Sequence, residues 1–276
     1  MRKISISSWA IPQPLDELCA GAKKIGYDGI SLGGFPPFGA HPDIVDTPEK
    51  KAALVKTFKD AGLEVADYAL DMWKYDALKQ TAEWRAEYTR ALKCAAELGL
   101  TKIMRVDTCT PPILPEGMSY DEVKQFFVKH FTEMANEAAE YGFDVVWEFE
   151  PGFMINEPKN VKWILDNVKA PNFSLLFDTC HAYNCALGHR HIEEGCKLEG
   201  GVEEFIELVK AEHEKITVCN EYTFDFTCQS ELVNQYGRVI GQGNESQIVT
   251  YTVTITHNGE TESIELASMI KGAYLK

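Results

Sequence analysis

Two short stretches of the sequence carry residues that can do chemistry at the end of an apolar run. The first, "VVWEFEPGF", holds Glu148 and Glu150. The second, "LLFDTCHAY", lies further along the chain and holds Asp178 and His181. Carboxylates and imidazoles move protons in catalysis and bind divalent metal ions. These four residues are therefore the first candidates for a functional site.

A basic residue and a further acid end a neighbouring apolar run, "KIMRVDT", which holds Arg105 and Asp107. Residues two apart share one face of a strand, so Glu148 and Glu150 are expected on one face. If that face is buried, the two acids repel and lose hydration unless a cation lies between them. A divalent metal ion is one solution. The alternative is that Arg105 neutralises one carboxylate in a structural ion pair.

Glycines mark the elements that must position these residues. The segments "AKKIGYDGISL", "FKDAGLEVADY", "AAELGLTKIMRV" and "AAEYGFDVVWEF" each read as the end of a helix, a glycine and an apolar strand. Gly26, Gly62, Gly99 and Gly142 are predicted to adopt the left-handed conformation that closes a helix. Their nearly regular spacing indicates repeated strand–helix units.

Six strands and the helices between them follow from this pattern. The strands are predicted at residues 3–9, 28–34, 64–70, 102–108, 143–150 and 173–179, with helices at 47–61, 79–98, 120–141 and 157–168. Such alternation is typical of an α/β fold with a parallel sheet. The regular units, and the absence of a glycine fingerprint after the first strand, favour a (β/α)8 TIM barrel over a doubly wound sheet. Active sites of such barrels lie at the C-terminal ends of the strands. The residues to weigh at those ends are Trp9 to Gln13, Phe35 to His41, Asp71 and Trp73, Arg105 and Asp107, Glu148 and Glu150, and Asp178 with His181.

The last part of the chain allows two interpretations. In one, strands at 215–224 and 246–259 and helices at 228–237 and 262–275 complete eight units. In the other, an atypical C-terminal part forms an extra β-hairpin that turns at "HNGE" and pairs residues 247–257 with 261–267. The strict alternation of "SQIVTYTVTITHNG" is unusual for a barrel strand, which is buried on both faces.

Composition bounds the class of protein. The chain has 276 residues with 45% hydrophobic residues and a net charge of −15, which suits one large domain, residues 1–276, and speaks against general nucleic-acid binding. The eight cysteines show no CxxC pair and are expected to be reduced thiols. No stretch reads as a signal peptide or a membrane span, so a cytoplasmic protein without membrane contact is expected.

The pairing of "WEFEP" with "FDTCHAYN" resembles the xylose isomerase-like superfamily of sugar isomerases and epimerases. "GYDGISL", "AGLEVADY" and "GLTKIMRVD" look like its second, third and fourth units, so the similarity runs from about residue 3 to residue 210. The resemblance implies a TIM barrel with one divalent metal ion, with Mn²⁺ or Mg²⁺ ahead of Co²⁺ or Zn²⁺. In the family, Glu, Asp, His and Glu from the ends of the last four strands bind this ion.

The resemblance carries over to individual residues. Glu150, followed by Pro151, matches the first metal ligand, and Asp178 matches the second. His181 matches a histidine that contacts substrate hydroxyls, and Glu148 is then an acid behind the ligands, or the ligand itself if the register differs by one pleat. The remaining ligands have no match in "ITVCNEYTFD", so residues 212–276 diverge from the family. Possible substitutes, among which nothing selects, are Glu221, His257, His189 and His191.

The function that the resemblance implies is that of a metal-dependent sugar isomerase or epimerase. It would act on a small carbohydrate or polyol-like substrate by proton abstraction and a metal-stabilised enediolate, with Glu150 moving the proton. Arg105 and His181 would hold substrate oxygens. Trp9, with Trp73 and Trp147, would supply apolar walls, although Trp147 also suits the core.

Three alternatives remain open. The same proton abstraction serves a lyase, either a dehydratase of a keto-sugar or inosose or a C-glycoside deglycosidase subunit. The chain can instead be a non-catalytic barrel, a partner subunit that keeps the fold and has lost its metal. The assembly itself stays open between a homo-oligomer and a hetero-oligomer with a partner subunit. The apurinic endonuclease branch of the superfamily is disfavoured by the charge of −15.

Overall fold

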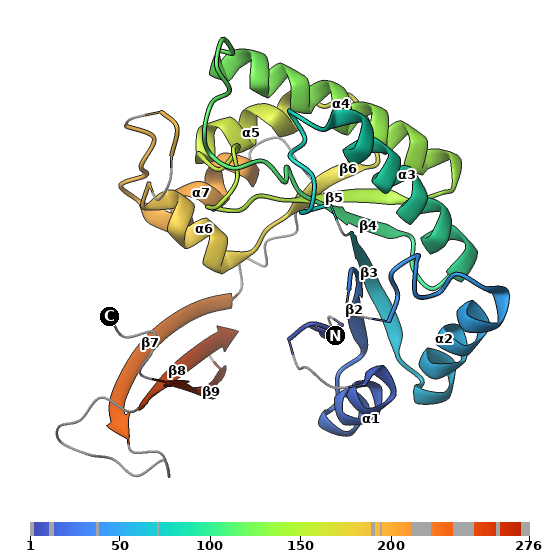
Figure 1. Cartoon of the computed structure of the whole chain (residues 1–276). Helices are drawn as coiled ribbons and strands as arrows, with labels where there is room; N and C mark the ends of the chain where they lie inside the picture. The colour runs from blue at the N-terminus through green and yellow to red at the C-terminus, as the bar shows by residue number, and fades with distance from the viewer. Residues whose placement is uncertain are drawn as a thin grey trace. The chain divides into compact units, whose positions relative to one another are not determined.

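Six parallel strands alternate with helices in the computed structural model (Figure 1). The structure describes residues 3–10, 14–36, 39–70, 72–188, 191–193, 195–210, 222–233, 246–257 and 260–271. These residues fall into two units, Met1–His213 and Glu214–Lys276, and each is described by itself.

The first unit holds the parallel sheet and its helices. Its strands are β1 (Ser5–Ser7), β2 (Gly29–Gly34), β3 (Glu64–Leu70), β4 (Ile103–Val106), β5 (Asp144–Glu148) and β6 (Phe173–Leu176). Its helices are α1 (Leu15–Ile25), α2 (Pro48–Ala61), α3 (Thr81–Leu98), α4 (Tyr120–Glu140), α5 (Pro158–Asn167), α6 (Thr179–Ala186) and α7 (Gly201–Lys210). The six predicted strands and the four predicted helices are all confirmed.

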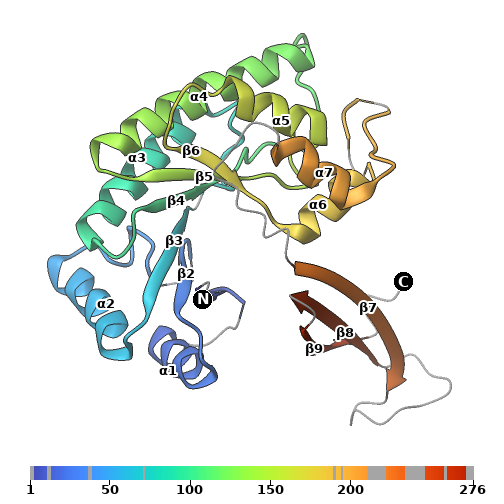
Figure 2. The ribbon, with the colours of Figure 1, turned by 180° about the vertical axis from the view of Figure 1, so that it is seen from behind.

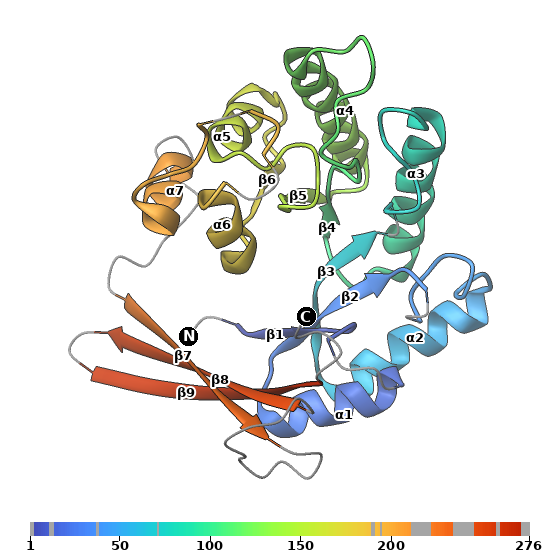
Figure 3. The ribbon, with the colours of Figure 1, turned by 60° about the vertical axis from the view of Figure 1, so that its left-hand side comes forward.

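The sheet runs in the order β1-β2-β3-β4-β5-β6, with every pair parallel. Helices α1 to α5 cover its outer face, and the sheet curves away from them (Figures 2 and 3). This is the α/β architecture of a TIM barrel, as predicted. The C-terminal ends of all six strands therefore meet at one rim.

Left-handed glycines end the helices as the sequence predicts. Gly26, Gly62 and Gly99 cap α1, α2 and α3 with φ angles of 107°, 61° and 62°. Gly142 follows α4 with a φ of 70°. Each glycine turns the chain back towards the sheet at a conformation that a side chain would strain.

The core lies between the sheet and the helices. Trp84 and Phe127, from α3 and α4, and Trp147, from β5, are each fully buried. The ring of Trp147 packs on Phe131 at 5.4 Å between centroids. The alternative that placed Trp147 in the core is therefore confirmed, and Trp147 is no wall of the site.

Two further observations concern the described residues alone. No helix among them is long and apolar enough to cross a membrane. The six cysteines whose side chains the structure describes are all free thiols, and Cys19, Cys94, Cys109 and Cys185 are buried.

The second unit is a three-stranded antiparallel sheet in the order β7-β8-β9. Its strands are β7 (Tyr222–Val233), β8 (Ser246–His257) and β9 (Glu260–Lys271). Strands β8 and β9 pair from His257↔Glu260 to Ser246↔Lys271, so the predicted hairpin is confirmed and extends further than expected.

The eight-unit interpretation of this region is wrong. Residues 228–233, predicted to open a helix, belong to β7, and residues 262–271, also predicted as helix, belong to β9. The backbone register explains the outcome, because residues 260–271 pair with β8 along its whole length. This pairing outweighs a weak helical period.

Candidate active site

The C-terminal ends of β5 and β6 bring together three residues that could hold a metal ion. Glu148 ends β5, Glu150 follows it by two residues, and His181 lies in the first turn of α6. One potential ligand atom from each lies within 4.8 Å of those of the others. Two of these residues, Glu150 and His181, were predicted as site residues, and Glu148 was the open alternative.

Arg105 pairs with one of the two glutamates. Its guanidinium donates to Glu148 Oε2. The Arg105 side chain is 18% exposed and that of Glu148 only 2%. The same guanidinium lies over the ring of Trp9, 5.1 Å from its centroid. The ion pair considered from the sequence therefore exists, and Glu148 is the carboxylate that it neutralises.

Glu150 has a different environment. Within the described part of the chain, no group donates a hydrogen bond to its carboxylate. Burial raises the pKa of Glu150, and the negative charges of Asp107 and Asp178 raise it further. Burial also raises the pKa of Glu148, although Arg105 acts in the opposite direction. A partly buried acid among other acids is a place where a cation lowers the electrostatic cost.

Asp178 and His181 are held by the start of α6. Asp178 is the N-cap of this helix, and its Oδ1 accepts from the backbone N–H of His181 at 2.9 Å. His181 Nδ1 lies 3.1 Å from the carbonyl oxygen of Phe149. Because a carbonyl only accepts, that contact places the proton on Nδ1, so Nε2 of neutral His181 carries the lone pair. The imidazole is thus oriented as a base or a ligand.

Asp107 directly follows β4, and it is only 8% exposed. It accepts from the indole Nε1 of Trp73 at 2.6 Å and from the thiol of Cys109. Burial raises the pKa of Asp107 to about 6. Cys109 has a φ of 51°, the one positive φ of a non-glycine residue among the described residues. A residue held in that region stores strain, which is common near functional sites.

Aromatic rings line the ends of the first three strands. Trp9 and Phe35 lie 5.4 Å apart between ring centroids, and Phe35 and Trp73 also lie 5.4 Å apart. Trp73 is 51% exposed, whereas Phe35 is buried. Trp9 was predicted as a substrate-binding residue, and the structure connects it to the polar side chains through Arg105.

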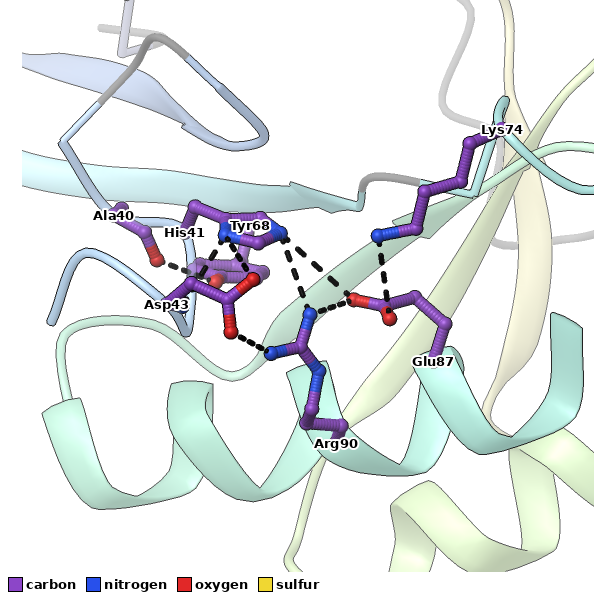
Figure 4. Close-up of polar contacts among 7 residues, drawn as sticks. All are labelled: Ala40, His41, Asp43, Tyr68, Lys74, Glu87 and Arg90. Carbon is purple, nitrogen blue, oxygen red and sulfur yellow. Dashed lines mark hydrogen bonds and ion pairs between the residues drawn. The ribbon is translucent and has the colours of Figure 1, made fainter. Parts of the chain in front are cut away.

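Other candidates lie elsewhere or outside the described residues. His41 is buried behind the rim, where it faces Glu87 and Arg90 of α3 (Figure 4). His191 is half-buried in a short loop, and His257 pairs by backbone register with Tyr222 and Glu260. The candidates that fall outside the described residues are Gln13, Asp71, His189 and Glu221.

The sequence predicted where these side chains lie along the strands, but it did not show which side chains contact each other. It placed Asp107 and Trp73 at strand ends but gave no sign that they touch. It also missed Glu157, which is fully buried and accepts from the backbone of Ile192 and Glu193 at 2.7 and 3.1 Å. The only signal was a carboxylate directly before a helix that begins with Pro158.

Comparison with known protein families shows which family the chain belongs to. A family described as xylose isomerase-like TIM barrel matches residues 19–223, more than half of the chain. The chain belongs to this family. The match includes β2 to β6 and every residue of the acid and imidazole cluster, which confirms the resemblance seen in the sequence. Comparison with curated proteins gives no match.

Solved structures of the xylose isomerase-like fold are similar at low identity. A probable 3-DHS dehydratase from Bacillus anthracis has a TM-score of 0.56 at 14% identity, over 76% of this chain and 70% of that one. D-psicose 3-epimerase from Clostridium cellulolyticum H10, solved with D-tagatose, has a TM-score of 0.56 at 16% identity, over 75% and 71%. The IOLI protein, solved with a zinc atom, has a TM-score of 0.53 at 19% identity, over 67% of this chain and 65% of that one, which is less than two thirds of its length. These likenesses show the fold.

Proposed function

We propose that this member of the xylose isomerase-like family is a divalent-metal-dependent sugar isomerase or epimerase acting on a small carbohydrate or polyol-like substrate. The observation that carries the proposal is the environment of Glu150. Its carboxylate is half-buried among acids, lies beside His181, and receives no hydrogen bond from the described residues. Glu148, two residues away, is already paired with Arg105.

The donor set fits a hard divalent cation. Glu150 and Asp178 are the proposed ligands. Glu150 lies in one cluster with His181 and Glu148, whereas Asp178 is not part of that cluster and acts on Glu150 through its charge. Carboxylate oxygens with an imidazole and no thiolate suit Mn²⁺ or Mg²⁺, and also Co²⁺ or Zn²⁺. Structures with the same fold hold zinc in one case and magnesium in another, which supports a metal without choosing one. A bound cation would polarise a substrate carbonyl and offset the negative charge of an enediolate.

The side chains of the chain itself account for the proton transfer. Glu150 would take the proton from the carbon beside the carbonyl, since its carboxylate receives no hydrogen bond from the described residues. His181, with its lone pair on Nε2, would accept a hydrogen bond from a substrate hydroxyl. Arg105 has donors beyond the one that Glu148 uses, so it could hold a further substrate oxygen. Trp9 would shield these polar contacts from water.

Exchange of a carbon-bound proton with solvent tests this proposal directly. The protein would be incubated with Mn²⁺ in D₂O, with D-fructose and D-tagatose as substrates, and deuterium at carbon would be followed by NMR. We expect incorporation by the wild type, loss on Glu150→Gln, and no change on Glu140→Gln, a control at the end of α4. Incorporation that is unaffected by Glu150→Gln would overturn the proposal.

The same experiment separates the alternatives from the sequence. Loss of water from 3-dehydroshikimate, without epimerisation of the ketoses, would identify a lyase. Absence of both reactions in a protein that binds no Mn²⁺ would identify a non-catalytic barrel. Either result contradicts the isomerase proposal.

A further inference from the structure

We infer that Trp73 is a specificity-determining residue and that Asp107 is the positioning residue that fixes it. Trp73 and Trp9, with the buried ring of Phe35 packed between them, then present a preformed aromatic surface to the ring of a cyclic sugar or cyclitol. This inference rests on the proposed function for the location of the reacting carbon. It adds the shape of the substrate, a closed ring with an apolar C–H face.

The contact between Asp107 and Trp73 is the first support. The indole N–H of Trp73 donates to Asp107 Oδ2 at 2.6 Å, while half of the Trp73 side chain faces solvent. An exposed tryptophan normally samples several rotamers, and ordering it costs entropy. A hydrogen bond to a buried carboxylate removes that freedom before a substrate arrives. The ring is therefore held as an open face rather than packed away.

Asp107 is itself fixed from behind. The thiol of Cys109 donates to its second oxygen, Oδ1, so each carboxylate oxygen has one partner. Cys109 reaches this place only because its backbone takes a φ of 51°. Strain of this kind persists where the surrounding structure compensates for it. The turn after β4 is thus shaped to aim Asp107 at Trp73.

A second anchor holds the two loops that carry Phe35 and Trp73. Figure 4 shows Glu87 and Arg90 of α3 pointing at the loop after β2, while Lys74, from the loop after β3, reaches Glu87. Arg90 donates to Glu87 Oε1 at 2.7 Å and also to Asp43. Lys74 Nζ lies 3.5 Å from Glu87 Oε2. The buried carboxylate of Glu87 therefore connects both loops to one helix.

The loop after β2 is also held at its backbone. The hydroxyl of Tyr68 donates to the carbonyl of Ala40 at 2.7 Å, next to the buried His41. The ring of Tyr68 passes so close to Gly34 that a Cβ there would lie 2.4 Å from it. Glycine at the end of β2 is thus required for this contact. With both loops anchored, Phe35 and Trp73 keep their distance of 5.4 Å.

The aromatic face and the acids belong to the same rim. Arg105 pairs with Glu148 and lies over Trp9, which joins the two groups directly. Asp107, which holds Trp73, is close enough to Glu150 to raise its pKa. Small-molecule sites combine aromatic surface with a few polar groups that fix orientation. A pyranose or cyclitol ring offers the matching pair of surfaces, C–H bonds on one face and hydroxyls at the edge.

Fluorine NMR of protein labelled with 5-fluorotryptophan tests the inference without turnover, so it remains readable if the proposed reaction is wrong. The chain has five tryptophans, of which Trp84 and Trp147 are buried and report folding. The probe is methyl β-D-glucopyranoside in the presence of Mg²⁺, and D-glucitol is the open-chain comparison. We expect the pyranoside to shift the Trp9 and Trp73 resonances, and glucitol to bind more weakly.

Variants of Asp107 separate positioning from general structure. Asp107→Leu removes the acceptor and should weaken pyranoside binding by about threefold to tenfold, the usual effect of one lost hydrogen bond. Asp107→Asn keeps an acceptor oxygen and should bind within about twofold of the wild type. Equal binding by the wild type and Asp107→Leu, or no response of Trp73 to the pyranoside, would overturn the inference.

The fluorine resonances of the buried Trp84 and Trp147 show whether Asp107→Leu folds. If it does not fold, Trp73→Phe provides the test instead. This change retains an aromatic ring on the surface, removes the N–H donor and makes the ring system smaller. Binding, now followed on Trp9, should weaken by a similar factor, and the matched change Trp163→Phe on α5 should have no effect. Unchanged binding by Trp73→Phe would also overturn the inference.

Discussion

Two groups of side chains line the rim of the sheet, one charged and one aromatic, and we call them the acidic wall and the aromatic wall. The acidic wall, formed by Glu148, Glu150 and His181 at the ends of β5 and β6, holds charges in a partly buried place. The aromatic wall, formed by Trp9, Phe35 and Trp73 at the ends of β1 to β3, gains from ring contacts and burial. The first wall costs stability and the second contributes to it. The burial of these acids therefore points to a role other than folding.

Arg105 neutralises the buried carboxylate of Glu148 in the acidic wall, so its loss should have the largest effect on stability. Arg105→Met leaves Glu148 buried without its partner, which typically costs about 3–5 kcal/mol of unfolding free energy. Urea unfolding of the metal-free protein measures this. The double change Arg105→Met with Glu148→Leu should recover most of the loss, and a double variant as unstable as the single one would show that the ion pair is not the cause.

A divalent cation should relieve the acidic wall and leave the aromatic wall unaffected. At a concentration of 100 times its dissociation constant, Mn²⁺ should stabilise the folded protein by about 2.7 kcal/mol. Thermal unfolding with and without Mn²⁺ at neutral pH measures this shift. Asp178→Asn should reduce it strongly, whereas Trp73→Phe should not change it. Equal shifts in all three proteins would mean that the metal binds elsewhere.

The pH dependence of stability should report the buried acid between the two walls. The pKa of Asp107 is about 6 in the folded protein and 3.8 as its ordinary value. The folded state therefore binds more protons between these values, and the free energy of unfolding falls as pH rises through this window. The fall should be about 3 kcal/mol in the metal-free protein. Asp107→Asn should show a smaller fall, and an equal slope in the variant would contradict the assignment.

The smallest effect is expected at a position that touches neither wall. Ser119 caps α4, and it forms a capping box with Glu122. Ser119→Ala should cost about 1 kcal/mol of unfolding free energy. Metal affinity and pyranoside binding should stay unchanged in this variant. It therefore shows whether changes in binding merely follow loss of stability.

The sequence predicted the elements well because their signals are local. Left-handed glycines at Gly26, Gly62 and Gly99 and the periodicity around them were enough to place six strands and their helices. The positions of Glu148 and Glu150 followed from where β5 ends. A parallel sheet then requires the acids of neighbouring strands to share one rim.

The partners of these residues were not predictable in the same way. Whether Arg105 pairs with Glu148 or Glu150 depends on cross-strand register and side-chain rotamers, which a single sequence does not show. The contact between Trp73 and Asp107 joins the loops that follow two different strands, β3 and β4. The helical interpretation of residues 262–271 failed because a segment with both periods takes the structure that its neighbours stabilise, here β8.

Titration calorimetry of Mn²⁺ binding tests the central claim most directly. We expect one Mn²⁺ per chain in the wild type. Glu150→Gln should weaken binding by about 100-fold or more, since even the loss of a residue that only supports a ligand costs about 10- to 100-fold. Glu140→Gln should bind as the wild type does. Binding that is unchanged by Glu150→Gln, or no binding by the wild type, would contradict the account.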